Sequence, residues 1–288
     1  MKLLIAESET PDERDQRRAS VGKSSGETYA ATLRQSAPGA SITVVRPADD
    51  DALTYTSGDL REYDAVFLTG SPLHIYEDTP AVGRQLAFMR AVFAAGTPSF
   101  GSCAGLQVAV AAAGGRVRKM PARMEAGIAR RIVATDAGRD HPLLAGRPPT
   151  WDAAAVHGDE VETLPDGATL LAGNPVTRVQ AVEIRHDAGV FWGVQYHPEL
   201  AIGEIAVALR RQAAGLVEAG LADDEAAVAD QADRLAALHR DPDKRALRWG
   251  LGVDGEFADE AGRRREIVNF LAALPTLDGR YGASGATV

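Results

Sequence analysis

Short apolar runs alternate with longer segments of helical spacing along the first half of the chain. Four apolar runs predict buried strands, at Lys2–Ala6, Ser41–Val45, Asp64–Leu68 and Thr97–Phe100. Three segments with apolar residues at helical intervals predict helices, at Glu27–Ser36, Thr79–Ala95 and Leu106–Ala113. Strands and helices that alternate in this way are typical of an α/β protein with a parallel sheet.

Further strands are predicted between Gly115 and about Leu200. They are expected at Gly115–Val133, as one or two strands, and at Thr169–Ala172, Val179–Arg185 and the run from Val190. Two segments lack a clear period. Asp136–Thr150 is dense in Gly and Pro and is expected to be a loop, and Pro11–Ser25 is so polar that we expect a loop or the start of an exposed helix.

Beyond Leu200 the composition changes to Ala, Glu and Arg. The pattern predicts three helices, at about Ile205–Ala219, Asp223–His239 and Asp259–Leu274. We therefore expect a core of residues 1–200 and a helical extension of residues 201–288 that packs on it. The tail, Leu277–Val288, is expected to be poorly ordered.

Charge and cysteine content narrow the class of protein. The 288 residues carry 40 acidic and 31 basic side chains, a formal charge of −9, so neither nucleic acid nor a membrane surface is an expected partner. A small-molecule substrate fits this balance better. The single cysteine excludes an intramolecular disulfide, and Glu7 follows the apolar start too early for a signal peptide. We expect a cytoplasmic protein.

The single cysteine lies in the sequence Gly-Ser-Cys-Ala-Gly-Leu-Gln, residues 101–107, directly after a predicted strand and before a predicted helix. Small residues on both sides allow a sharp strand-to-helix turn, the arrangement that exposes a nucleophile. The N-terminus of the following helix favours the thiolate form of Cys103. A buried structural cysteine is the alternative, and Cys103 alone does not decide between the two.

A histidine and a carboxylate follow the apolar run from Val190. His197 and Glu199 are two residues apart, so on an extended segment their side chains point the same way. Glu199 can then orient the imidazole while its other nitrogen faces Cys103. An adjacent imidazole raises the thiolate fraction of a cysteine and later donates a proton to a leaving amine.

With these two motifs, Gly-x-Cys-x-Gly-x-Gln and His-Pro-Glu, the chain resembles the class I glutamine amidotransferase family. The resemblance runs from the first strand to about Leu200, and is closest to the glutaminase half of GMP synthetase because of the sequence Val-His-Gly-Asp-Glu-Val at residues 156–161. It implies an open, mostly parallel, flavodoxin-like sheet with helices on both faces.

The resemblance also implies roles for individual residues. Cys103, His197 and Glu199 would be the catalytic triad. The backbone N–H groups of Ser71 and Ala104 would form the oxyanion hole. The remaining residues implied to contact substrate are Gly70, Gln107, His157, Gly158 and Asp159.

The implied reaction is hydrolysis of the glutamine side-chain amide through a γ-glutamyl thioester on Cys103, without a cofactor. Amidotransferases pass the ammonia to a synthetase, and no second ATP-binding domain fits in the remaining residues. Either a partner synthetase receives the ammonia, or the chain is a stand-alone γ-glutamyl amide hydrolase. A homo-oligomer also stays open.

Other functions remain possible on the residues alone. His157, Asp159, His197 and Glu199 are residue types that bind Zn or Mn, which would make a metal protein. A redox or protease-like branch is disfavoured because Ala104, and not a histidine, follows the cysteine. A non-catalytic interaction protein is disfavoured because no triad position is lost. The remaining histidines without a motif are expected at the surface or in packing: His74, His186 and His239.

Overall fold

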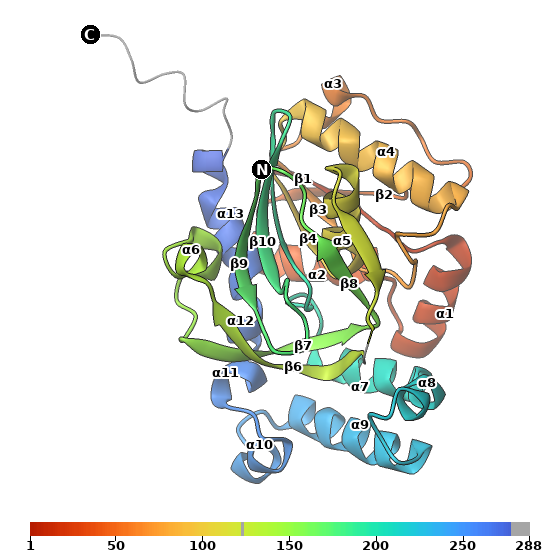
Figure 1. The fold of residues 1–288 in the computed structure, drawn as a ribbon, viewed down its shortest axis with the longest axis vertical. Coiled ribbons are helices and arrows are strands. Elements are labelled where there is room, and N and C mark those ends of the chain that lie inside the picture. The colour runs from red at the N-terminus through yellow and green to blue at the C-terminus, as the bar shows by residue number, and fades with distance from the viewer. Residues whose placement is uncertain (122–123, 278–288) are drawn as a thin grey trace.

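The computed structural model of the chain describes residues 1–121 and 124–277. Within these residues nine strands form one sheet, in the order β2-β1-β3-β4-β11-β10-β9-β6-β7 (Figure 1). The first five are parallel: β2 (Ser41–Val45), β1 (Lys2–Ala6), β3 (Ala65–Leu68), β4 (Ser99–Ser102) and β11 (Gly189–Val194). The predicted α/β class with a mostly parallel central sheet is confirmed.

Successive side chains of the parallel strands point to opposite faces of the sheet. From β1, Leu3 and Ile5 join an apolar cluster with α2 (Ser25–Ser36), whereas Leu4 belongs to a second cluster. The helices of that second cluster are α3 (Ser57–Leu60), α4 (Pro80–Ala95) and α5 (Ala104–Ala112). Because both faces are covered, the carboxyl ends of the strands remain as the accessible edge.

The sheet continues past β11 as an antiparallel extension. Its strands are β10 (Ala181–His186), β9 (Ala168–Gly173), β6 (Glu125–Ala134) and β7 (Thr150–His157). A separate pair joins β5 (Arg116–Lys119) to β8 (Asp159–Thr163). Only Gly158 separates β7 from β8, so the chain changes sheets there.

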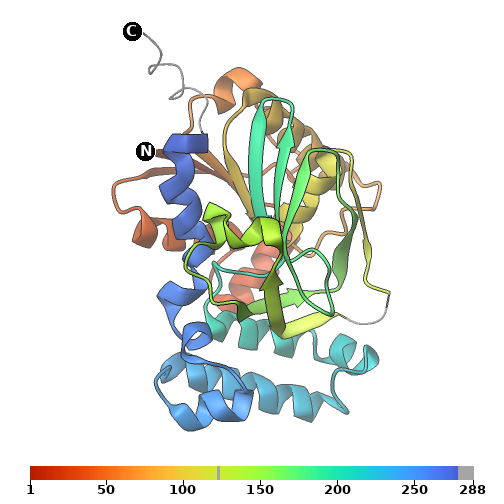
Figure 2. The same cartoon turned by 60° about the vertical axis from the view of Figure 1, so that its left-hand side comes forward.

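The C-terminal helices cover two different surfaces. They are α7 (Ile202–Arg211), α8 (Ala213–Glu218), α9 (Glu225–Arg240), α10 (Arg245–Leu251), α11 (Gly255–Ala258), α12 (Glu260–Arg263) and α13 (Arg265–Leu277). The group around α7 and α9 forms a third apolar cluster with β6 and β7. The last helix, α13, returns to the main sheet (Figure 2). There Phe270 packs on Phe67, Phe100 and Trp192. The predicted helical extension is present, and its boundary at residue 200 stays a prediction.

The two segments without a clear period are both partly helical, which was one of the two alternatives expected for the first segment but was not expected for the second. The polar stretch after β1 is a helix, α1 (Pro11–Val21), opened by reciprocal capping between Thr10 and Glu13 and closed by Gly22 at a φ of 83°. The expected loop at 136–150 contains α6 (Asp136–Arg139) and a 3-10 turn, Pro142–Leu144. Both are too short or too polar to show an apolar period. The expected disorder after Leu277 lies outside the described residues.

None of the described helices is both long enough and apolar enough to cross a membrane.

Candidate active site

Cys103 lies on a sharp turn between β4 and α5. Its φ of 53° and ψ of −114° are outside the regions that residues with a Cβ prefer, a strain of about 1–3 kcal/mol. Its N–H donates to the Val194 carbonyl at 2.9 Å, which ties the turn to β11. A Cβ on Gly105 would lie 2.4 Å from the Leu68 carbonyl oxygen, so glycine allows α5 to approach β3. The expected strand-to-helix turn is therefore present.

His197 and Glu199 lie in the turn after β11. The strand ends at Val194, so the two side chains do not share a strand as the sequence suggested. The His197 N–H donates to the Ala154 carbonyl at 2.8 Å, which holds this turn against β7. His197 Nδ1 lies 2.7 Å from Glu199 Oε1, and the same ring hydrogen-bonds to the Cys103 side chain. The Cys103 side chain thus contacts the His197 ring, and the ring contacts the Glu199 carboxylate.

Charge at this site favours the imidazolium form of His197. Burial alone disfavours that cation, but the negative charges of Glu199 and Cys103 outweigh burial and raise the pKa of His197 to about 10. Glu199 Oε2 is buried without a hydrogen-bond partner among the described residues. The negative charge of Glu199 is therefore balanced by the His197 ring, which contacts its other oxygen. At neutral pH the ring can therefore donate a proton.

Gly70 and Ser71 follow β3 and border the thiol. A Cβ on Gly70 would lie 3.6 Å from Cys103 Cβ and 3.0 Å from His197 Cε1. Ala104 is the first residue of α5, where backbone N–H groups have no partner within the helix. The Ser71 hydroxyl accepts a hydrogen bond from the Leu73 N–H at 3.3 Å, which closes the turn. The oxyanion-hole roles of Ser71 and Ala104 stay predictions.

The predicted substrate residues on the other side of Cys103 form a connected network. Gln107 Nε2 donates to the Asp159 carbonyl at 3.2 Å, and His157 Nδ1 lies 2.9 Å from the same oxygen. His157 Nε2 lies 3.2 Å from Glu125, a buried carboxylate that also accepts from Thr177 and Gln180. These contacts fix the β7–β8 corner at Gly158. Their roles toward substrate stay predictions.

A cavity of about 670 Å³ joins these groups. Cys103, His197 and Glu199 line it, together with the predicted substrate residues Gly70, Gln107, His157, Gly158 and Asp159 and the predicted oxyanion residue Ser71. The cavity also extends to α1, α2 and the end of α7. A molecule larger than the reacting amide can therefore occupy it.

The metal alternative has no matching geometry. The described residues contain no group of three or more His, Cys, Asp or Glu side chains arranged to hold a metal ion. His157 pairs with Glu125 and His197 pairs with Glu199, so the two imidazoles belong to separate contacts.

Comparison with known proteins decides the family. The model of the family described as glutamine amidotransferase class-I matches residues 22–213. The chain belongs to the class I glutamine amidotransferase family. The match spans the strained turn at Cys103, the His-Pro-Glu turn and the β7–β8 corner, so it covers every group described above except the residues contributed by α1.

Relatives of this class I amidotransferase include two kinds of enzyme. A γ-glutamyl-L-1-hydroxyisopropylamide hydrolase from Pseudomonas sp. is 38% identical over 225 residues, which are 76% of this chain and 75% of that protein. A glutamine-hydrolyzing GMP synthase from Leifsonia xyli is 32% identical over 154 residues, 52% of this chain but only 29% of the synthase.

Solved structures with this fold cover nearly the whole amidotransferase chain. A glutamine amidotransferase from Thermotoga maritima aligns over 95% of this chain and 97% of its own, with a TM-score of 0.63 and 16% identity. A glutamine amidotransferase from Methylobacillus flagellatus aligns over 93% and 94%, with a TM-score of 0.55 and 18% identity. The fold shared with them includes the C-terminal helices.

Several cavity residues of this amidotransferase were not predicted from the sequence. Glu9 and Arg17 line the cavity from the segment after β1, and Ser25 lines it from the start of α2. His74, expected at the surface or in packing, is half-exposed, and its Nδ1 lies 2.6 Å from Asp159 Oδ2 at the cavity. The Thr-x-x-Glu capping signal before α1 was a usable clue to an ordered helix there.

Proposed function

We propose that the chain hydrolyses γ-glutamyl amides through a thioester on Cys103, with glutamine as the simplest such substrate. The observation that carries this proposal is the direct sequence of contacts from the Cys103 side chain to His197 and from His197 to Glu199 at the wall of a cavity. Membership of the family and the similarity to a γ-glutamyl amide hydrolase support it.

Acylation begins with the Cys103 thiolate. Its sulfur attacks the γ-carbonyl carbon, and the carbonyl oxygen takes the negative charge toward the N–H groups of Ser71 and Ala104. As the carbon–nitrogen bond breaks, the His197 imidazolium gives its proton to the leaving nitrogen. The product is ammonia or an amine, and a γ-glutamyl thioester remains on Cys103.

Deacylation uses the same imidazole as a base. In the thioester the sulfur no longer carries a charge, so one of the two negative charges that raise the pKa of His197 is removed. Neutral His197 then takes a proton from water, whose oxygen attacks the thioester carbonyl. The carbon–sulfur bond breaks, glutamate leaves, and the thiolate–imidazolium pair is restored. Glu199 orients the ring in both steps.

The glutamyl end of the substrate is assigned to the network on the β8 side of the cavity. Gln107, His157, Gly158 and Asp159 present amide, imidazole, backbone and carboxylate groups that complement an α-amino acid. Glu125 acts behind them as a positioning residue, because it holds His157. Gly70 leaves room for the reacting carbonyl beside Cys103.

A second candidate is an ammonia-supplying subunit of a synthetase. The matches to GMP synthases favour it, although the chain covers only about a quarter to a third of their length. In that case glutamine would be the preferred amide, and a separate protein would receive the ammonia.

Glutamate release from a panel of amides tests the proposal. Glutamine and N-substituted γ-glutamyl amides are offered to the purified chain, alone and with cell extract. Substituted amides turned over by the chain alone would support the hydrolase, and turnover of glutamine that rises with extract would support the synthetase subunit. Cys103→Ala should abolish release in both cases, and unimpaired turnover by this variant would contradict the thioester mechanism.

A further inference from the structure

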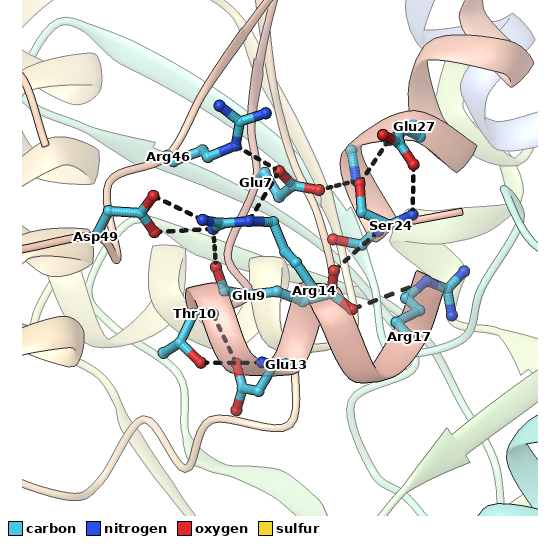
Figure 3. Close-up of polar contacts among 12 residues, drawn as sticks. Glu7, Glu9, Thr10, Glu13, Arg14, Arg17, Ser24, Glu27, Arg46 and Asp49 are labelled. Atoms are coloured by element: carbon cyan, nitrogen blue, oxygen red, sulfur yellow. Dashed lines mark hydrogen bonds and ion pairs between the residues drawn. The ribbon is translucent and has the colours of Figure 1, made fainter. Parts of the chain in front are cut away.

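Glu9 presents a buried carboxylate to the active-site cavity, and one of its oxygens has no hydrogen bond among those found in the described residues. The residue is 4% exposed, and it lines the cavity together with Cys103 and His197. Its Oε2 accepts a hydrogen bond from the Ser25 N–H at 2.9 Å. Its Oε1 forms an ion pair with Arg17, whose Nε lies 3.8 Å away, beyond hydrogen-bond distance (Figure 3).

The surrounding helices hold Glu9 in this position. Arg14 donates to the Glu9 carbonyl at 2.7 Å and makes a two-pronged contact with Asp49 at 2.8 and 2.7 Å (Figure 3). Arg17 donates to Glu204 of α7 at 3.0 Å, and its own Nε is buried without a hydrogen-bond partner among the described residues. Glu9 and Arg17 are thus held by neighbours and form an ion pair, but no direct hydrogen bond joins Glu9 Oε1 to Arg17 Nε.

A line of contacts connects Glu9 to the reacting atoms. Ser25, whose N–H binds Glu9, also hydrogen-bonds through its hydroxyl to Thr69 at 3.0 Å, and the next residue is Gly70 beside His197 and Cys103. Farther along α2, Thr32 donates to the Glu199 carbonyl at 3.3 Å. Glu9 is therefore linked through Ser25 and Thr69 to the segment that borders His197 and Cys103.

The two ends of a γ-glutamyl amide have different requirements. The glutamyl end is assigned to Gln107 and Asp159, which lie on α5 and β8. The leaving nitrogen must face His197, which gives it a proton. A substituent on that nitrogen then extends away from the glutamyl end, into the part of the cavity formed by the β1–α1 segment and α2.

We propose that Glu9 determines specificity for the leaving amine, by accepting a hydrogen bond from a hydroxyl or ammonium group on its substituent. This inference rests on the proposed function. Burial raises the pKa of Glu9, although the hydrogen bonds from Ser25 and the charge of Arg17 act in the opposite direction. A ligand donor supplies the missing hydrogen bond, whereas an alkyl substituent of the same size leaves the oxygen unsatisfied.

Isosteric amides test this with the unmodified chain. The kcat/KM values of γ-glutamyl-2-hydroxyethylamide and γ-glutamyl-2-aminoethylamide are compared with that of γ-glutamylpropylamide. In a second series, γ-glutamyl-3-hydroxypropylamide and γ-glutamyl-3-aminopropylamide are compared with γ-glutamylbutylamide. The two series separate the effect of the polar group from the effect of chain length. We expect at least one polar member to exceed its alkyl isostere by about tenfold, and the two polar series distinguish a hydroxyl from an ammonium ligand. Equal values throughout, or a preference for γ-glutamylglycine, would overturn the inference.

Two variants then test whether Glu9 causes the preference for polar over alkyl substituents. Glu9→Gln should reduce the ratio of polar to alkyl kcat/KM by about tenfold while the value for glutamine changes less than about threefold. Asp12→Asn, the same chemical change at an exposed position of α1, should leave the ratio unchanged. An equal loss for every substrate, glutamine included, would place Glu9 at the glutamyl end and contradict the inference.

Binding to Cys103→Ala, measured by calorimetry, separates this inference from the proposed function. If no amide is turned over by the unmodified chain but the polar amides bind about tenfold more tightly than their isosteres, the hydrolase proposal fails and the Glu9 site stands. If all amides are turned over and bind without discrimination, only the Glu9 site fails.

Discussion

Two negatively charged groups, Glu199 and Cys103, lie beside the His197 ring. Glu199 contacts Nδ1 at 2.7 Å, and the Cys103 side chain hydrogen-bonds to the same imidazole. Their combined effect exceeds that of burial, so the protonated ring persists far above the usual pKa of histidine. In the proposed mechanism this arrangement lets one residue act first as an acid and then as a base, because acylation of the sulfur removes one charge.

The pH dependence of acylation follows from this. The pKa of His197 is raised to about 10, so the imidazolium persists through neutral pH and is lost as the pH rises through about 10. We expect kcat/KM for a γ-glutamyl amide to fall on the alkaline side near pH 10. A fall centred near pH 6.5 would contradict the assigned charge state.

Glu199→Gln removes the larger of the two charges that raise the pKa of His197. The alkaline fall in kcat/KM should move to lower pH, and activity at neutral pH should drop by about 100-fold or more, because the ring loses both its counter-charge and its orientation. Glu162→Gln, which alters a remote ion pair with Arg116 and Arg118, is the matched control and should keep the profile of the unmodified chain. A variant profile with an unchanged alkaline limb would show that Glu199 does not set this pKa.

At the scale of elements, the site depends on how closely α5 approaches β3. Gly105 is in the first turn of α5, and a side chain there would meet the Leu68 carbonyl. The strained backbone of Cys103 immediately precedes that turn, so a displacement of α5 moves the thiol and the Ala104 N–H together.

Gly105→Ala should therefore destabilise the fold by about 2 kcal/mol or more and reduce kcat. Gly215→Ala is its control, because Gly215 lies in α8 with open space around it and should gain about 0.5–1 kcal/mol from the change. Urea unfolding measures both free energies of unfolding. Equal effects at the two positions would mean that the close approach of α5 is not needed.

The elements that carry long periodic patterns were predictable from the sequence. β2 matches its predicted range, and α4 begins one residue later than expected, because strong alternation and clear caps mark them. The Cys103 turn was predictable for the same local reason, since small residues surround the cysteine. The short helices α6, α10 and α11 were missed because a helix of four to seven residues shows too few turns for a period.

The part of the site that was missed depends on contacts between distant residues. Glu9 reaches the cavity only because α2 starts beside Thr69, and Arg17 meets Glu204 across 187 positions. His74 pairs with Asp159 across 85 positions. No local pattern around any of these residues encodes such a contact, so only the folded chain reveals it.

At the scale of the whole molecule, the C-terminal helix contacts the turn that carries His197. Glu266 of α13 is fully buried and accepts hydrogen bonds from Arg147, through two contacts of 2.7 Å, and from the Tyr196 hydroxyl at 2.8 Å. Tyr196 precedes His197 in the chain. Nearby negative charge raises the pKa of Arg147 further despite its burial, so the guanidinium remains charged.

Glu266→Gln leaves the buried Arg147 charge without its full counter-charge. We expect a loss of about 3 kcal/mol in the free energy of unfolding, measured in urea, together with reduced kcat. Glu218→Gln, at an exposed position of α8, should change stability by less than about 0.5 kcal/mol. Unchanged stability of the Glu266 variant would show that α13 is not coupled to the core through this ion pair.

The most direct test of the cysteine mechanism is mass spectrometry of the intact chain after reaction with a glutamine-mimicking electrophile. The account predicts one adduct per chain, located on the peptide that contains Cys103, slowed by excess γ-glutamyl amide and absent from Cys103→Ala. Because the sequence holds a single cysteine, a thiol adduct has only one possible position. An unlabelled protein, or labelling that a γ-glutamyl amide does not slow, would contradict the account.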